Sequence, residues 1–202
     1  MRAIKTTLTA TLMSLLVAGC AAPTRYVDPA ADDGAVTLAL DYRDFERAAT
    51  ATVEDMLASG AVDNPSGKRY VMVVSRITND TMQRIDTDQL VKKIRVALLR
   101  SGKVVTTTAV GLNGAEDEMT SKARELRKSD EFDQSGVEKK GTLQAPDLSL
   151  SGKILQRNHQ VDGEQQVEYY VQLTLTDLTS GLATWEGETQ IIKRGPDDSV
   201  AW

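Results

Sequence analysis

The sequence has very few of the residues from which disulfides, metal sites and acid–base sites are built. It contains one cysteine, Cys20, and one histidine, His159, in 202 residues. A single cysteine excludes a disulfide within the chain, so packing alone must hold the fold. His159 precedes the turn signal Asp162-Gly163 and has no thiol or acidic cluster near it in the sequence. We therefore expect a solvent-exposed residue rather than a metal ligand or a general base.

Phosphate-binding loops are missing as well. Ser-Gly-Lys occurs three times, beginning at Ser66, Ser101 and Ser151. None of the copies has the longer glycine spacing of a phosphate loop or a Ser or Thr after the lysine. Serine-hydrolase signatures are absent too. The sequence therefore predicts no enzyme, no catalytic residue, no metal site and no cofactor.

Acidic residues outnumber basic ones, and aromatic side chains are scarce. The formal net charge is −5, and aromatic residues make up 4% of the chain. Because no basic stripe is present to neutralise phosphates, we expect no nucleic-acid partner. The core must be built mostly from Val, Leu, Ile, Met and Ala, and the length suits one domain.

No long hydrophobic run stands at the beginning of the chain. The apolar stretch at residues 8–18 is about 11 residues long, well short of the roughly 20 that span a bilayer. It follows Arg2 and Lys5 and ends at the small residues Ala18 and Gly19. This layout excludes a transmembrane helix and is typical of a cleaved signal peptide.

Cys20, directly after this segment, resembles the lipobox cysteine of bacterial lipoproteins. The resemblance implies that residues 1–19 are a signal peptide and that Cys20 carries the lipid anchor. Ala21 stands where Asp marks inner-membrane retention in enteric bacteria. We therefore expect a lipid anchor in the outer membrane, on its periplasmic face. The alternative is a plain secretory signal, or a buried first helix, with an accidental cysteine.

Beyond Cys20 the chain divides into a linker, a domain and a tail. Residues 20–40 are rich in Ala, Asp, Pro and Gly without a sustained period, which predicts a flexible linker. After the linker, segments with the apolar spacing of a helix alternate with short β-branched runs that predict strands. From Asp147 onward, apolar residues recur at every second position, which also predicts strands. Trp185 falls on the inner face of that last region. The predicted helices are 41–59, 86–100, 115–128 and a short one within 133–140; the predicted strands are 70–74, 104–110 and three from residue 147 onward.

This order predicts an α/β fold. It consists of a single mixed β-sheet of about five strands with helices packed on it, in the order helix, strand, helix, strand, helix, helix, strand, strand, strand. The last three strands form an antiparallel meander, with a tight turn at Asp162-Gly163. We expect the globular domain to span residues 41–195 and residues 196–202 to form a frayed tail.

Five segments resemble a known family in their order and spacing. They are VSRITNDT at 74–81, IDT at 85–87, ALLRSGK at 97–103, TDLTSG at 176–181 and WEG at 185–187. Together they are similar to LpoB, the family of lipoprotein activators of class A penicillin-binding proteins. The same segments suit the related folds of the TolB amino-terminal domain and the secretion lipoprotein CsgG. The resemblance implies a monomeric, non-enzymatic outer-membrane lipoprotein that binds and stimulates a peptidoglycan synthase.

The chain departs from the enterobacterial LpoB pattern in two places. Its linker is about 20 residues long, whereas the enterobacterial proteins carry a long proline-rich tether. Pro146 also interrupts the usual Ala-Asp pair before the third strand. The alternative function is a structural envelope lipoprotein of CsgG-like fold, associated with secretion or an appendage.

The predicted partner surface is the positively charged part of an otherwise acidic domain. It comprises Glu138, Lys139 and Lys140, together with Arg157 at an adjoining strand end. The alternative is ordinary solvated charge, because isolated surface lysines usually contribute little energy.

Overall fold

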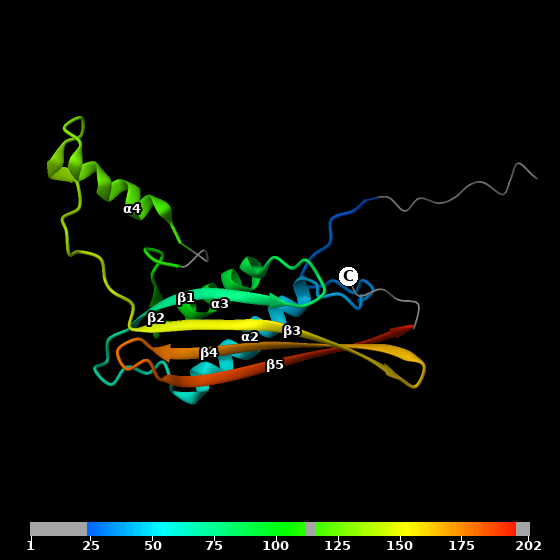
Figure 1. Ribbon diagram of the computed structural model, residues 1–202. Helices are drawn as coiled ribbons and strands as arrows, with labels where there is room; N and C mark the ends of the chain where they lie inside the picture. The colour runs from blue at the N-terminus through cyan, green and yellow to red at the C-terminus, as the bar shows by residue number, and fades with distance from the viewer. Residues whose placement is uncertain (1–23, 112–115, 197–202) are drawn as a thin grey trace, which may run out of the picture. The chain divides into compact units, whose positions relative to one another are not determined.

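The computed structural model describes residues 24–111 and 116–196 (Figure 1). The predicted signal peptide, Cys20 and residues 197–202 of the predicted tail lie outside these ranges. The chain divides into a unit that ends at Ala35 and a folded unit that begins at Val36. In the first unit, the carboxylate of Asp28 accepts a hydrogen bond from the amide of Ala30 at 3.0 Å. No helix among the described residues is long and apolar enough to cross a membrane.

The folded unit is built on one five-stranded mixed sheet with the order β2-β1-β3-β4-β5. β1 is parallel to β2 and to β3, whereas β3, β4 and β5 form an antiparallel meander. Helix α3 packs against β1 and β2, and helix α2 packs against β5 and α3. The α/β fold with one mixed sheet, predicted from the sequence, is confirmed. The elements are α2 (Tyr42–Ser59), β1 (Tyr70–Asp80), α3 (Thr87–Ser101), β2 (Val104–Thr106), α4 (Glu118–Glu125), β3 (Leu148–Val161), β4 (Glu164–Asp177) and β5 (Ala183–Pro196).

Helix α2 begins after Asp41 and ends before Gly60, the two residues expected to cap it. The Asp41 carboxylate accepts hydrogen bonds from the amides of Arg43 (2.8 Å) and Asp44 (3.3 Å), and the Asp44 carboxylate accepts one from the Asp41 amide (2.8 Å). This reciprocal capping satisfies amides that have no partner within the helix. Gly60 ends the helix at φ 75°, in the left-handed region where a Cβ is unfavourable. The apolar face of α2 is buried through Phe45, Ala48, Ala49, Val53 and Met56.

The meander supplies most of the sheet's buried face. Alternate residues of the three strands are buried, as their period of two predicted; they include Leu148, Leu150, Ile154, Val167, Tyr169, Val171, Leu173, Leu175, Trp185 and Ile191. Trp185 is 9% exposed, and its indole N–H donates to Asp55 at 3.0 Å. Asp162 and Gly163, at φ 53° and 82°, form the two-residue turn between β3 and β4. A Cβ on Gly152 would lie 2.2 Å from the Gln172 carbonyl oxygen, so this strand position requires glycine.

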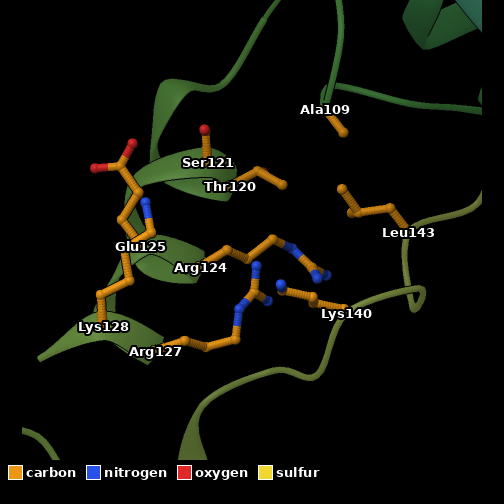
Figure 2. Close-up of a pocket in the computed structure, with 9 residues that line it drawn as sticks. All are labelled: Ala109, Thr120, Ser121, Arg124, Glu125, Arg127, Lys128, Lys140 and Leu143. Carbon is orange, nitrogen blue, oxygen red and sulfur yellow. The ribbon is translucent and has the colours of Figure 1, made fainter.

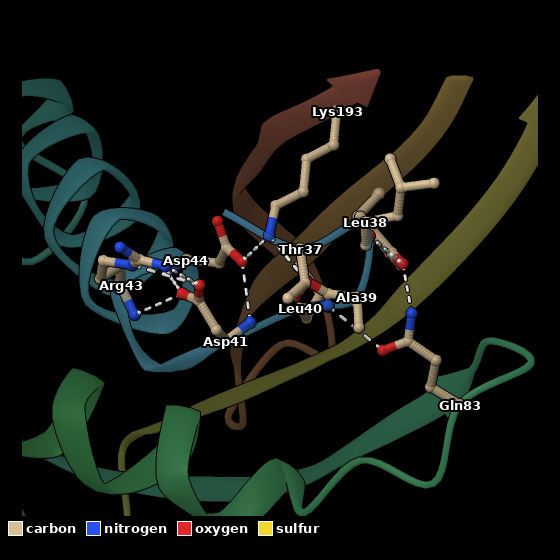
Figure 3. Close-up of polar contacts among 10 residues, drawn as sticks. Thr37, Leu38, Ala39, Leu40, Asp41, Arg43, Asp44, Gln83 and Lys193 are labelled. Carbon is tan, nitrogen blue, oxygen red and sulfur yellow. Dashed lines mark hydrogen bonds and ion pairs between the residues drawn. The ribbon is translucent and has the colours of Figure 1, made fainter. Parts of the chain in front are cut away.

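Residues 36–41, which we call the N-terminal strap, lie against the sheet and belong to the folded unit (Figure 3). Leu38 is 6% exposed and joins the core. The Tyr169 hydroxyl donates to the Leu38 carbonyl at 2.9 Å, and the Lys193 ammonium donates to the Ala39 carbonyl at 2.6 Å. Residues 36–40, which their composition assigned to the linker, therefore belong to the folded unit. The alternation of Val36, Leu38 and Leu40 is only three apolar residues long, too short a signal to place Leu38 in the core.

A buried polar network fixes the strap further. Lys193 forms an ion pair with Asp44 at 2.5 Å, and the two side chains are 7% and 5% exposed. The Gln83 side-chain amide donates to the Tyr169 hydroxyl, and its carbonyl accepts from the Leu40 amide at 3.2 Å. Burial raises the pKa of Tyr169 to about 12, so its hydroxyl stays protonated and keeps its donor.

The parallel half of the sheet differs from the prediction in its strand lengths. β1 continues to Asp80, through residues expected to form a loop, because a bulge between Val74 and Ile77 returns Ile77 to the core. The strand predicted over 104–110 ends at Thr106. The predicted helix over 115–128 is α4 followed by a 3₁₀ turn, Leu126–Lys128, and the region 133–140 contributes only the 3₁₀ turn Gln134–Gly136.

Candidate partner-binding surface

The chain between β2 and β3, residues 107–147, leaves the sheet and carries helix α4; we call it the β2–β3 arm (Figure 1). Of its described residues only Gly111 is buried. Asp117 caps α4 by accepting a hydrogen bond from the Met119 amide at 3.0 Å. The Asp117 amide donates to the Thr108 carbonyl at 2.8 Å, which closes the base of the arm. A segment that buries so little apolar surface adds little to the stability of the core and is free to serve binding.

Asp147 fixes the point at which the arm returns to the sheet. Its amide donates to the Val71 carbonyl at 2.7 Å, and its carboxylate accepts from the Val71 amide at 2.8 Å. Its carbonyl accepts from the Leu178 amide at 2.9 Å. One residue thus joins the starts of β1 and β3 to the turn after β4.

Helix α4 and the loop after residue 137 face each other across an open cavity of about 390 Å³ (Figure 2). The Arg124 guanidinium donates to the Lys139 carbonyl at 3.2 Å and to the Thr142 hydroxyl at 3.0 Å. The Arg127 guanidinium donates to the Glu138 carbonyl at 2.7 Å. These bonds hold the loop against the helix because the two arginines, three residues apart, lie on the same helical face.

The structure divides the predicted partner surface into two places. Glu138 and Lys139 lie in the arm, where their carbonyls bind the two arginines, and the Lys140 side chain lines the cavity. Arg157 is not at a strand end, since β3 continues to Val161. Its guanidinium lies 5.5 Å from the ring centre of Tyr170, on β4. We therefore treat the arm and the region around Arg157 as separate candidates.

Arg157 belongs to the sheet face that points away from α2 and α3, which we call the outer sheet face. There the Glu168 carboxylate accepts hydrogen bonds from the Tyr170 hydroxyl (2.6 Å) and the Gln166 amide (2.7 Å). The hydrogen bond from Tyr170, followed by the one from Gln166, lowers the pKa of Glu168. The bond between Tyr170 and Glu168 also raises the pKa of Tyr170. His159, which is 49% exposed, lies 3.5 Å from Glu168, so the prediction of an exposed residue is confirmed.

The same face carries a second hydrogen-bonded carboxylate on β5. Glu188 accepts from Gln172 at 2.7 Å and from Gln190 at 3.0 Å, and these two bonds lower its pKa. The outer sheet face therefore presents two hydrogen-bonded carboxylates, Glu168 and Glu188, near Arg157. The sequence contained the signal for this arrangement, because a two-residue turn at Asp162-Gly163 sets the register that places Glu168 opposite Arg157.

The described residues contain no group of three or more His, Cys, Asp or Glu side chains placed to hold a metal ion. The arm cavity is lined by arginine, lysine, hydroxyl and apolar side chains, with Glu125 as its one acid. Both surfaces are suited to recognition of a charged partner.

Comparison with known proteins gives a family. The family model described as peptidoglycan-synthase activator LpoB matches residues 44–191. The LpoB C-terminal domain from Escherichia coli has 15% identity and a TM-score of 0.43, covering 73% of this chain and 98% of that chain. The corresponding domain from Salmonella enterica has 16% identity and a TM-score of 0.43, with the same coverage. Lipoprotein GNA1162 from Neisseria meningitidis has 10% identity and a TM-score of 0.36, covering 62% of this chain and 83% of that chain.

No curated protein matches the chain at a significant level. The matched span of the family model runs from the first turn of α2 into β5 and covers more than half of the chain. On this match the chain belongs to the peptidoglycan-synthase activator LpoB family.

Proposed function

We propose that this chain is a lipid-anchored, monomeric regulator that binds a class A penicillin-binding protein and stimulates its synthesis of peptidoglycan, without a reaction of its own. The observation that supports the proposal is the family match, which takes in almost every element of the folded unit. The charged surfaces of the arm and the outer sheet face suit protein recognition.

The proposal includes an anchor at Cys20, in the outer membrane on its periplasmic face. Because the folded unit begins at Val36, we take residues 21–35 as the tether. Fully extended, this tether reaches about 50 Å. The synthase must therefore present its docking site within the combined reach of this tether and the folded unit from the membrane that holds the lipid. Replacing Cys20 by Ser should move the protein from the membrane to the soluble envelope fraction, and unchanged membrane partition would contradict the anchor.

The contact with the synthase is proposed at Glu138, Lys139 and Lys140 of the arm and at Arg157 of the outer sheet face. Since the structure separates these two places, each is tested alone. One variant carries Lys139→Glu with Lys140→Glu, and the other carries Arg157→Glu. Charge reversal at the true contact should slow association with the synthase, and more strongly at low salt.

The experiment measures glycan-chain synthesis by the purified cognate synthase, with and without the full chain in detergent. The wild-type chain should raise the rate, and one of the two variants should lose most of that effect at unchanged melting temperature. A matched control is Lys68→Glu with Arg69→Glu, a neighbouring pair of exposed cations in the loop before β1.

Two results would contradict the proposal at different levels. Full stimulation by both contact variants would place the docking surface elsewhere on the domain. No binding or stimulation of any class A synthase from the source organism would refute the activator function itself and favour a structural role in the envelope.

A further inference from the structure

The cavity of the β2–β3 arm gathers positive charge in a chain whose net charge is −5. Four of its lining residues are cations, Arg124, Arg127, Lys128 and Lys140, and one is an acid, Glu125. In the described parts of the chain, none of these four cations forms a salt bridge. The lining therefore carries a net positive charge, with Glu125 as its one acid.

The cationic ends converge. Figure 2 shows the side-chain ends of Arg124, Arg127 and Lys140 pointing toward one another from α4 and from the facing loop, while the Glu125 carboxylate points away from them. Like charges that converge repel one another, and water screens this repulsion only in part. An anion placed among the three groups would relieve the repulsion.

The two guanidinium groups are already held in place. Arg124 and Arg127 each use one terminal nitrogen to donate to the loop, at Lys139, Thr142 and Glu138. A guanidinium has five N–H donors, so each retains donors for a ligand. Because these side chains are ordered beforehand, a ligand does not have to bear the full entropic cost of ordering them.

The remaining lining suits a small organic ligand rather than a bare ion. The cavity, at about 390 Å³, is within the size range of small-molecule sites. Thr120 and Ser121 supply hydroxyls, and Ala109 and Leu143 supply apolar surface. A flat, solvated basic surface would lack this combination of hydroxyl and apolar groups around a hollow.

We propose that this cavity binds one anionic group, a carboxylate or a phosphate, carried by a small organic ligand. Arg124 and Arg127 donate paired hydrogen bonds to its oxygens, and Lys140 contributes a mobile point charge. This site shares Lys140 with the contact proposed above, but binding of the ligand requires no synthase and is measured without it.

The test is a titration of the full chain in detergent, labelled with ¹⁵N at arginine, followed through the side-chain N–H signals. Glycerol 3-phosphate and N-acetylglutamate are the two probes, so that phosphate and carboxylate sources are distinguished. We expect saturable shifts of a small set of arginine signals with at least one probe. The affinity should fall when sodium chloride is raised from about 50 to about 300 mM.

Two variants separate a site from diffuse charge. Lys140→Met should weaken binding by about fivefold or more, because it removes one of the three converging charges. Lys122→Met is the matched control, since Lys122 is exposed on the same helix but does not line the cavity; its affinity should match the wild type. Absence of saturable shifts with both probes, or equal weakening by the two variants, would overturn the proposal.

Discussion

The ion pair of Lys193 with Asp44 offers the sharpest test of how the strap is held. Both side chains are almost completely buried, and the ammonium also donates to the Ala39 carbonyl. Lys193→Met keeps most of the apolar stem but leaves the Asp44 carboxylate buried without its cation. Removing one partner of such a pair typically costs about 3–5 kcal/mol, so we expect a loss of that size in the free energy of unfolding.

The reasoning predicts a partial rescue. Adding Asp44→Asn to Lys193→Met removes the uncompensated charge, and asparagine still offers an oxygen to the Asp41 amide. The double variant should therefore be more stable than the sum of the single effects by about 1 kcal/mol or more.

Urea unfolding, followed by circular dichroism, gives the four free energies of this cycle. Lys153→Met, at an exposed lysine of β3, serves as the control and should change stability by less than about 0.5 kcal/mol. A loss below about 1 kcal/mol for Lys193→Met, or additive effects in the double variant, would refute a stabilising role for the buried pair.

Three further predictions concern the sheet. Because the Tyr169 pKa is raised from 10.0 to about 12, its stabilising contribution is complete below pH 10 and lost as pH rises toward 12; Tyr169→Phe should remove that part of the alkaline decline in melting temperature. Gly152→Ala should destabilise by about 2–4 kcal/mol in urea unfolding, whereas Gly136→Ala, where a Cβ meets nothing within 4 Å, should stay near neutral. Trp185→Ala should cost about 3–5 kcal/mol by the same measurement, through loss of packing.

Each of these has a plain contrary outcome. An unchanged alkaline decline in Tyr169→Phe would show that other groups cause it. Equal stability of the two glycine variants would mean that β4 moves to admit the new methyl group. A near-neutral Trp185→Ala would mean that the indole is not part of the core.

The antiparallel half of the sheet could be predicted from the sequence because its signals are local. In β4 every second residue from Val167 to Leu175 is buried, and a two-residue turn fixes the first hairpin. The register of this hairpin also places Arg157 opposite Glu168. This neighbour relation could be predicted only by following the outward-facing residues as well as the inward-facing ones. The period of two shows which residues share a face, and the turn type shows which residues lie opposite one another.

The elements that sequence could not define depend on contacts distant in the chain. Leu38 lies in the short alternation of Val36, Leu38 and Leu40, and the strap that carries it is held by Tyr169 and Lys193, far along the sequence. The extension of β1 to Asp80 rests on a bulge that has no residue signature of its own. The arm cavity joins α4 to a loop through arginine bonds to backbone carbonyls, which any residue would have supplied.

The bonds of the N-terminal strap determine which strands first receive a pulling force applied to the chain before Val36. A pull on the chain before Val36 reaches Leu38 first, whose carbonyl is bonded to Tyr169 on β4, and then Ala39, bonded to Lys193 on β5. Force from the tether is therefore received by the antiparallel meander. These first bonds reach β4 and β5 only, whereas the β2–β3 arm is attached through β2 and β3, so a pull on the strap acts on β4 and β5 before it acts on the arm.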